Sequence, residues 1–402
     1  MSVVTVIIGG GIGGFTVAKE LRELQPEALI KIIDPEGTPY DRPPLSKEVL
    51  AGTRDFSDLG FIAQEWFQDN SVEVLEDLVI QINGDQKTVT TRGGEKFSYD
   101  NLVFAVGGEP RRGATTGFDN EVMVLRTKDD TQRLKDACVP GCHIGIIGAG
   151  LIGAEVASTV RSLGGDVTLI DPMPVSLIPA VGEEIAHRLH DLHQEHGVEF
   201  IQGMTSGVES VGNKKRISID GHDDVVVDEV LLCIGITPNE ALAKSIGLEC
   251  DNGILVDEEQ RTNHESIWAV GDCARLRKSD GTLERRHEHW DSALQEGRAA
   301  AYSIASKPAP GRSAPWFWSD RYGVHVEGTG SMTEEGTTYL RPDAEGRPEV
   351  VFRVSKDNKL LGAAAYSNSM AIRAARRMID REIVVDPEKL VDPTVHLKKL
   401  AR

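Results

Sequence analysis

The sequence has little cysteine, few aromatic residues and no long apolar run. Five cysteines among 402 residues are an odd, widely spaced set, which excludes the disulfide framework of a small secreted protein and favours reduced thiols. No stretch approaches the roughly 18 to 20 continuous apolar residues of a membrane-spanning helix. The first residues also lack the basic segment that precedes the apolar core of a secretory signal. These absences predict a cytoplasmic protein.

Basic residues are scarce relative to acidic ones. The chain carries 44 Lys and Arg against 63 Asp and Glu, a formal net charge of −19. This charge repels nucleic-acid backbones and anionic lipid surfaces, so we expect neither as a partner. A chain of 402 residues, 40% of them hydrophobic, exceeds what one hydrophobic core usually organises and predicts two or three globular domains.

A glycine-rich loop follows the first apolar run. Residues 3–8 are mostly β-branched and predict a buried strand, and Gly9, Gly11 and Gly14 then fit the pattern G-x-G-x-x-G. A helical pattern over residues 15–24 and a second strand over 29–33 lead to Asp34. In such a unit the glycines allow a tight turn, close approach of a pyrophosphate and close helix packing, while the acid accepts a ribose hydroxyl. The spacing predicts a dinucleotide site.

The same arrangement recurs in the middle of the chain. An apolar run over residues 144–147 precedes Gly148, Gly150 and Gly153, and a second strand over 167–170 ends in Asp171. No Lys or Arg directly follows Asp171, which favours a free ribose hydroxyl over a 2′-phosphate, and hence NADH over NADPH. Two dinucleotide sites are therefore expected.

With both loops in view, the sequence resembles the ferredoxin reductase branch of the FAD-dependent pyridine-nucleotide oxidoreductases, which includes putidaredoxin, rubredoxin and aromatic-ring-dioxygenase ferredoxin reductases. The resemblance runs nearly end to end. Besides the loops, it depends on Tyr-Asp-Arg-Pro-Pro-Leu-Ser-Lys at 40–47, Ala-Val-Gly-Asp-Cys-Ala at 269–274, Glu-His-Trp at 288–290 and Pro-Trp-Phe-Trp-Ser-Asp at 315–320.

This resemblance implies FAD at the first loop and NADH at the second. The implied FAD contacts are Gly9, Gly11, Ile12, Gly13, Gly14, Asp34, Arg42, Lys47, Val79, Ala105, Gly107, Arg126, Gly271, Asp272 and Trp290. The implied NAD contacts are Gly148, Gly150, Leu151, Ile152, Gly153, Asp171 and Gly235. Two positions depart from the family pattern: Val106 stands where threonine is common, and Val175 where an arginine often follows the ribose-binding acid.

The resemblance also implies catalytic roles for three residues. Lys47 is expected beside the flavin, where an ammonium stabilises negative charge on the reduced ring, and Glu155 is its expected partner because a buried lysine needs one. Trp318 is expected to lie against the flavin and nicotinamide rings.

Two other patterns are interpreted as structural. Cys138 and Cys142 flank a Pro-Gly turn ahead of the second loop, and the place of a disulfide reductase's cysteine pair is taken by residues 42–47. The histidines at 187, 190, 193 and 196 recur every three residues among charged neighbours, which predicts surface histidines rather than a metal site. No metal is expected, and electrons on the flavin must leave to an external acceptor.

The predicted fold is α/β, with two nested Rossmann-like domains and a C-terminal α+β domain. We expect an FAD-binding domain at residues 1–112 and 239–315, an NAD-binding domain at 113–238, and a C-terminal domain at 316–402. The last has expected strands at 324–327, 350–354 and 360–365 and a helix near 371–379. Residues 371–402 carry a net charge of +3. Arg373, Arg376 and Arg377 are therefore candidates for docking a small acidic ferredoxin.

The function predicted from these features is that of an NADH:ferredoxin oxidoreductase, passing electrons from NADH through FAD to a small [2Fe–2S] ferredoxin, or a rubredoxin, that serves an oxygenase. Two alternatives stay open. One is an NADH oxidase or quinone reductase, and the other is an apoptosis-inducing-factor-like flavoprotein that responds to NADH.

Overall fold

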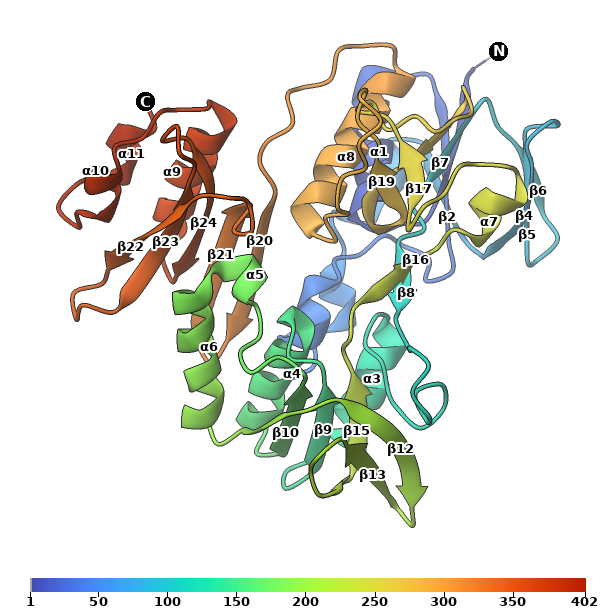
Figure 1. Ribbon diagram of the computed structural model, residues 1–402. Coiled ribbons are helices and arrows are strands. Elements are labelled where there is room, and N and C mark those ends of the chain that lie inside the picture. The colour runs from blue at the N-terminus through green and yellow to red at the C-terminus, as the bar shows by residue number, and fades with distance from the viewer. Residues whose placement is uncertain (1) are drawn as a thin grey trace. The chain divides into compact units, whose positions relative to one another are not determined.

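The computed structural model describes residues 2–402, which form two compact units (Figure 1). The first unit comprises the chain up to Arg42, Ser57–Glu109 and Ile236–Arg312. The second comprises Pro43–Phe56, Pro110–Gly235 and Ser313–Arg402. The chain therefore passes from one unit to the other several times, and each unit is assembled from separate segments.

A five-stranded parallel sheet forms the centre of the first unit. Its order is β18 (Ile267–Ala269), β7 (Asn101–Phe104), β1 (Val4–Ile8), β2 (Leu29–Asp34) and β3 (Val72–Glu76). Helices α1 (Ile12–Leu24) and α8 (Trp290–Ile304) pack against each other, closely enough that a Cβ on Gly297 would lie 2.5 Å from the Gly13 carbonyl oxygen. Because the strands are parallel, their carboxyl ends share one edge of the sheet, where α/β proteins bind ligands.

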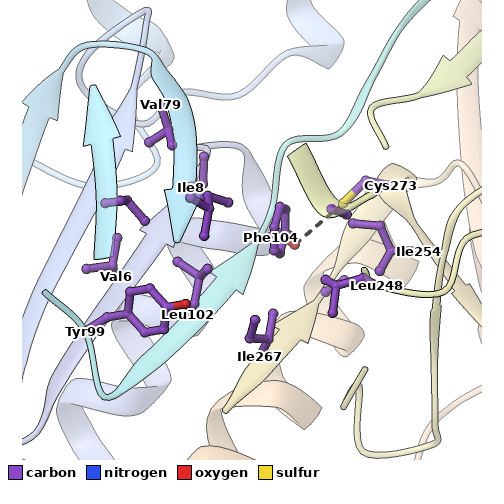
Figure 2. Packing of buried hydrophobic residues seen from close by; sticks show 14 of the residues in the cluster. Val6, Ile8, Val79, Tyr99, Leu102, Phe104, Leu248, Ile254, Ile267 and Cys273 are labelled. Carbon is purple, nitrogen blue, oxygen red and sulfur yellow. Dashed lines mark hydrogen bonds between the residues drawn. The ribbon is translucent and has the colours of Figure 1, made fainter. Parts of the chain in front are cut away.

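The face of this sheet that lies away from α1 and α8 supports a large apolar core. Figure 2 shows Val6 and Ile8 of β1 and Phe104 of β7 packed with Val79 and Ile254. The strands that complete the core and the short elements around it are β4 (Val79–Asn83), β5 (Thr88–Thr91), β6 (Lys96–Ser98), β8 (Gly108–Pro110), β16 (Ile236–Pro238), β17 (Ile254–Val256), β19 (Ala274–Leu276), α2 (Glu65–Asp69), α7 (Ala241–Ser245) and the 3₁₀ turns Phe56–Leu59 and Gly271–Cys273.

The second unit contains a second parallel sheet, in the order β11 (Glu199–Gln202), β10 (Asp166–Asp171), β9 (His143–Ile147) and β15 (Glu229–Leu232). Its associated elements are the 3₁₀ turn Pro43–Ser46, α3 (Lys128–Ala137), α4 (Leu151–Ser162), α5 (Ile178–Val181), α6 (Glu183–Glu195), β12 (Thr205–Val211), β13 (Lys214–Ile219) and β14 (Val225–Val227). Helix α3 begins at a capping box, in which Thr127 and Asp130 satisfy each other's backbone N–H groups.

The same unit ends in an antiparallel sheet in the order β20 (Trp316–Arg321), β21 (Val324–Gly330), β24 (Leu360–Tyr366), β23 (Pro348–Val354) and β22 (Thr337–Pro342). Helix α9 (Ser369–Asp380) packs on Val350 and Phe352, together with α10 (Pro387–Val391) and α11 (Leu397–Leu400). Helix α6 packs on Val351, on the other face. Both faces are covered, which explains the continuous apolar run in β23.

The α/β fold class and the C-terminal α+β domain are confirmed, and both Rossmann-like units have the strand, glycine loop, helix, strand order that the sequence predicts. Two C-terminal strands, β20 and β22, were not predicted. Among residues 2–402 there is no helix both long and apolar enough to cross a lipid bilayer.

Candidate functional site

The first glycine loop lies at the carboxyl end of β1. Gly9 has φ +106°, and a Cβ there would lie 2.2 Å from the Ala105 carbonyl oxygen, so this turn requires glycine. A Cβ on Gly14 would lie 2.1 Å from the Gly9 oxygen. At Gly11, by contrast, no atom of the described chain lies within 4 Å of the Cβ position. The loop is tight where it packs and open where a ligand would approach.

Asp34 closes this loop at the end of β2. Its carboxylate accepts hydrogen bonds from the N–H of Gly10 at 2.6 Å and of Glu36 at 2.8 Å. Gly10, Gly11, Asp34, Tyr40 and Arg42 line a small pocket. Arg42 pairs with Glu36 at 3.2 Å. Helix α1 begins here with no acid in its first turn, so its N-terminal N–H groups and dipole favour an anion.

The second loop repeats this geometry at the carboxyl end of β9. Asp171 accepts hydrogen bonds from the N–H of Ala149 at 2.7 Å and of Met173 at 2.9 Å. A Cβ on Gly153 would lie 2.0 Å from the Gly148 oxygen. At Gly150, by contrast, no described atom beyond the adjoining residues lies within 4 Å of the Cβ position. Both loops fit the pyrophosphate and ribose of a dinucleotide.

The Gly271–Asp272 turn stands at the end of β18, at the same sheet edge as the first loop. A buried glutamate of α8, Glu296, accepts the Gly271 N–H at 2.8 Å, and its other oxygen accepts from Arg312 at 3.0 Å. Burial raises the pKa of Glu296 to about 7, against the opposing effects of Arg312 and the Gly271 N–H. The side chain thus changes charge near neutral pH beside the turn expected to hold the flavin.

In the second unit, Lys47 and Glu155 form a buried ion pair. Lys47 Nζ lies 3.5 Å from Glu155 Oε1, and their side chains are only 12% and 7% exposed. Glu155 also accepts hydrogen bonds from Ser46 Oγ at 2.6 Å and Ser319 Oγ at 2.7 Å. Lys47 lies 5.6 Å from the centre of the Trp318 ring. The structure therefore brings together the three residues expected to be catalytic, and the carboxylate has the partners that a buried charge requires.

A second buried cation lies behind this pair. Arg321 donates to Ser319 Oγ at 3.1 Å, and burial lowers its pKa to about 10. Burial, reinforced by Arg321, lowers the pKa of His193 to about 3, and its Nδ1 is 2.9 Å from the Tyr322 hydroxyl. The prediction that the histidines at 187, 190, 193 and 196 are surface residues is wrong for His193, because α6 packs against the C-terminal sheet.

All five cysteines are free thiols. Burial raises the pKa of Cys138, Cys233 and Cys273 to about 12, so they stay protonated near neutral pH. Cys273 donates its S–H to the Phe104 carbonyl within the core of Figure 2. Among residues 2–402, no group of three or more His, Cys, Asp or Glu side chains could hold a metal ion.

Comparison with known proteins identifies the fold and its chemistry. A family model described as pyridine nucleotide-disulphide oxidoreductase matches residues 4–297. The chain belongs to this family of oxidoreductases. A second model, described as reductase C-terminal, matches residues 316–401 of this oxidoreductase.

The oxidoreductase has relatives of nearly its own length. It is 31% identical over 401 residues to the benzene 1,2-dioxygenase system ferredoxin–NAD(+) reductase subunit of Pseudomonas putida, with 98% of this chain and 97% of the relative covered. It is 33% identical to the anthranilate 1,2-dioxygenase system ferredoxin–NAD(+) reductase component of Burkholderia cepacia, with 98% of each covered. The reductase in a covalent putidaredoxin reductase–putidaredoxin complex matches with a TM-score of 0.92 at 29% identity, covering 99% of this chain and 97% of that one. The resemblance to ferredoxin reductases is confirmed.

The expected cofactor contacts are divided between the two units. The first unit holds Gly9, Gly11, Ile12, Gly13, Gly14, Asp34, Arg42, Val79, Ala105, Gly107, Gly271, Asp272 and Trp290. The second holds Lys47, Arg126, Gly148, Gly150, Leu151, Ile152, Gly153, Asp171 and Gly235. Val79 is buried in the core of Figure 2, and its residue position pairs with Thr91 in the β4–β5 ladder. The Trp290 indole N–H donates to Asp41 Oδ1 at 2.9 Å.

Sequence reasoning missed the residues that support these contacts. Glu296 and Arg321 are largely buried ionisable groups, and Ser46 and Ser319 orient Glu155. Ser46 lies in the 40–47 motif and Ser319 in the 315–320 motif. Their positions directly beside Lys47 and Trp318 in the sequence were the signal by which they could have been predicted as site residues. No comparable local signal marks Glu296.

Proposed function

We propose that the chain is an FAD-dependent NADH:ferredoxin oxidoreductase, which passes electrons from NADH to a small iron–sulfur protein that serves an oxygenase. The relatives of matching length are reductase components of dioxygenase systems, and the similar solved structure is a reductase joined to putidaredoxin. One observation carries the proposal: two dinucleotide-fitting loops accompany a buried lysine–glutamate pair, while burial keeps the thiols protonated.

The proposal assigns FAD to the domain at residues 1–112 and 239–315, and NADH to the domain at 113–238. When bound, FAD accepts a hydride from NADH and releases its electrons to the acceptor. The α1 N-terminus and Arg42 offset the charge of its pyrophosphate, and Asp272 accepts hydroxyl hydrogen bonds of its ribityl chain. Lys47, oriented by Glu155, places positive charge where the reduced ring becomes negative.

NADH is the preferred donor because Asp171 stands where a 2′-phosphate would have to bind. Both of its oxygens are already oriented by backbone N–H groups, which leaves their remaining lone pairs for ribose hydroxyls. Pro172, Met173 and Pro174 follow, and none of them offers a cation to a phosphate.

The acceptor is proposed to dock near helix α9. Arg373 and Arg377 are exposed on this helix, whereas Arg376 is half-buried and its Nε donates to the Ala314 carbonyl at 2.8 Å. Exposed cations on a strongly acidic protein provide a local attraction for an acidic ferredoxin. Arg373→Glu combined with Arg377→Glu should raise the KM for ferredoxin and flatten its salt dependence. Arg133→Glu, an exposed arginine of α3, is the control.

The test is NADH-driven cytochrome c reduction by the FAD-loaded protein, with and without a panel of [2Fe–2S] ferredoxins and one rubredoxin. Strong stimulation by one carrier is expected. If no carrier stimulates and NADH is consumed equally fast in air, an NADH oxidase or quinone reductase is the better assignment. If reduced flavin persists in air and no carrier speeds its reoxidation, the apoptosis-inducing-factor-like alternative is favoured.

A further inference from the structure

The proposed reaction releases one proton per turnover, and this inference rests on that reaction. NADH and two oxidised one-electron carriers give NAD⁺, H⁺ and two reduced carriers, so one hydrogen of NADH leaves as a hydride and ends as a proton in water. Lys47 and Glu155, the pair proposed beside the flavin, are nearly inaccessible to water. The proton therefore needs a route outward.

A line of polar groups leads from this pair toward the surface. Lys47 Nζ lies 3.3 Å from Asp320 Oδ2, and the other oxygen of Asp320 lies 2.5 Å from Nδ1 of His325. The side chains of Asp320 and His325 are 42% and 39% exposed, against 12% for Lys47. A continuous series of contacts thus leads from a nearly inaccessible ammonium to two side chains that both reach water.

The register of the C-terminal sheet explains why these groups meet. Asp320 of β20 pairs with His325 of β21, and Trp318 pairs with Glu327. Residues two apart along a strand share a face, so Trp318, Asp320, His325 and Glu327 all lie on one face of the hairpin. The ammonium of Lys47, which lies over the Trp318 ring, meets this face.

His325 has a second carboxylate on its other side. Glu327 Oε2 lies 3.8 Å from His325 Nε2, and this buried oxygen finds no hydrogen-bond partner among residues 2–402. The Trp316 indole N–H holds the other oxygen of Glu327 at 3.0 Å. One ring nitrogen thus faces Asp320 and the other faces an unsatisfied acceptor, so the imidazole can take a proton on one nitrogen and release one from the other.

We propose that Asp320 and His325 form the route by which this proton leaves the site. The Lys47 ammonium gives a proton to the Asp320 carboxylate and regains one from the reaction site. Asp320 passes its proton to His325 Nδ1, and the imidazolium loses one from Nε2 to water. Each group returns to its starting charge, so the relay consumes nothing and releases the single proton that the reaction requires.

The experiment follows proton release separately from electron transfer. Anaerobic FAD-loaded protein is reduced with one equivalent of NADH and mixed with two equivalents of ferricyanide in weakly buffered solution containing a pH indicator. His325→Gln should accept electrons from NADH at the wild-type rate but release its proton about a hundredfold more slowly, at the low end of the range for loss of a positioned proton-transfer group. Added imidazole should restore the rate. His187→Gln, an exposed histidine near Glu183 on α6, is the control and should behave as wild type.

Wild-type proton release in His325→Gln, or slow release that imidazole does not restore, would overturn the relay. A failure of NADH to reduce the flavin would instead count against the proposed oxidoreductase, so the two are distinguishable. A measurement on the cofactor-free protein supplies a second readout. Asp320→Asn should speed carbethoxylation of His325, measured by mass spectrometry, because the carboxylate engages Nδ1 in a short hydrogen bond that a neutral amide holds less tightly. An unchanged rate would show that the two groups are not coupled, and would also overturn the relay.

Discussion

The two glycines that begin helix α4 provide a test that separates folding from cofactor binding. At Gly150, φ is −68° and the Cβ position has no described atom within 4 Å, so alanine fits without strain. Gly150→Ala should leave stability unchanged or raise it by about 0.4 to 1 kcal/mol, because alanine restricts the unfolded chain. Its methyl group, however, occupies the surface that a pyrophosphate must approach. We expect NADH affinity to fall by about tenfold or more, which corresponds to about 1.4 kcal/mol.

Gly153→Ala should behave differently. Its Cβ would lie 2.0 Å from the Gly148 carbonyl oxygen, whereas ordinary contacts begin near 3.4 Å. The helix must move away from β9, at a cost of about 1 to 3 kcal/mol, as for other overpacked sites. Urea unfolding of the cofactor-free protein measures stability, and calorimetry of the FAD-loaded protein measures NADH binding. Wild-type NADH affinity in Gly150→Ala would refute the reasoning, since the pyrophosphate could not then lie against this loop.

Two further predictions concern buried titrating groups. The pKa of Glu296 is raised from its usual 4.5 to about 7, so the stability linked to its protonation is present below pH 4.5 and lost as pH rises through 7. As pH rises from 4.5 to 8, the free energy of unfolding of Glu296→Gln should therefore increase by up to about 3 kcal/mol relative to that of the wild type. A difference between the two proteins in urea unfolding that stays constant with pH would contradict this. The pKa of His193 is lowered from 6.5 to about 3, so the folded state loses stability as pH falls below 6.5. Between pH 6.5 and 5, His193→Gln should lose about 2 kcal/mol less free energy of unfolding than the wild type. If the denaturant midpoints of the two proteins fall equally with pH, His193 is not the cause of the acid sensitivity.

The Rossmann-like units were predictable because their signals are local. A β-branched strand, glycines at fixed spacing and an acid at the end of the next strand all fall within about 25 to 30 residues, as this motif requires. Strand β20 was missed for a physical reason. Ser319 and Arg321 alternate with Trp318 and Asp320, and both sets have polar partners, so no apolar face marks the strand.

The supporting residues of the site depend on contacts far apart in sequence. Ser319 lies 164 residues from Glu155, and Tyr322 lies 129 residues from His193. Periodicity within one segment cannot reveal such pairs, because it reports only which face of an element is apolar. The burial of His193 illustrates this limit. The charged neighbours on α6 indicate a solvent-exposed face, yet the C-terminal sheet covers that part of the helix.

Glu155 and Glu296, the buried carboxylates of the two units, differ in their partners. This difference predicts which of them makes FAD binding depend on pH. Glu155 is held by two hydroxyl groups and an ammonium, so its negative charge is matched inside its own unit. Glu296 has one amide N–H and one partly exposed arginine, while Asp272 and Glu284 oppose its ionisation. A change between pH 6 and 8 in the affinity of the protein for FAD should therefore originate at Glu296. If Glu296→Gln retains that dependence, the titrating group lies elsewhere, and the Gly271–Asp272 turn is held by geometry rather than by charge.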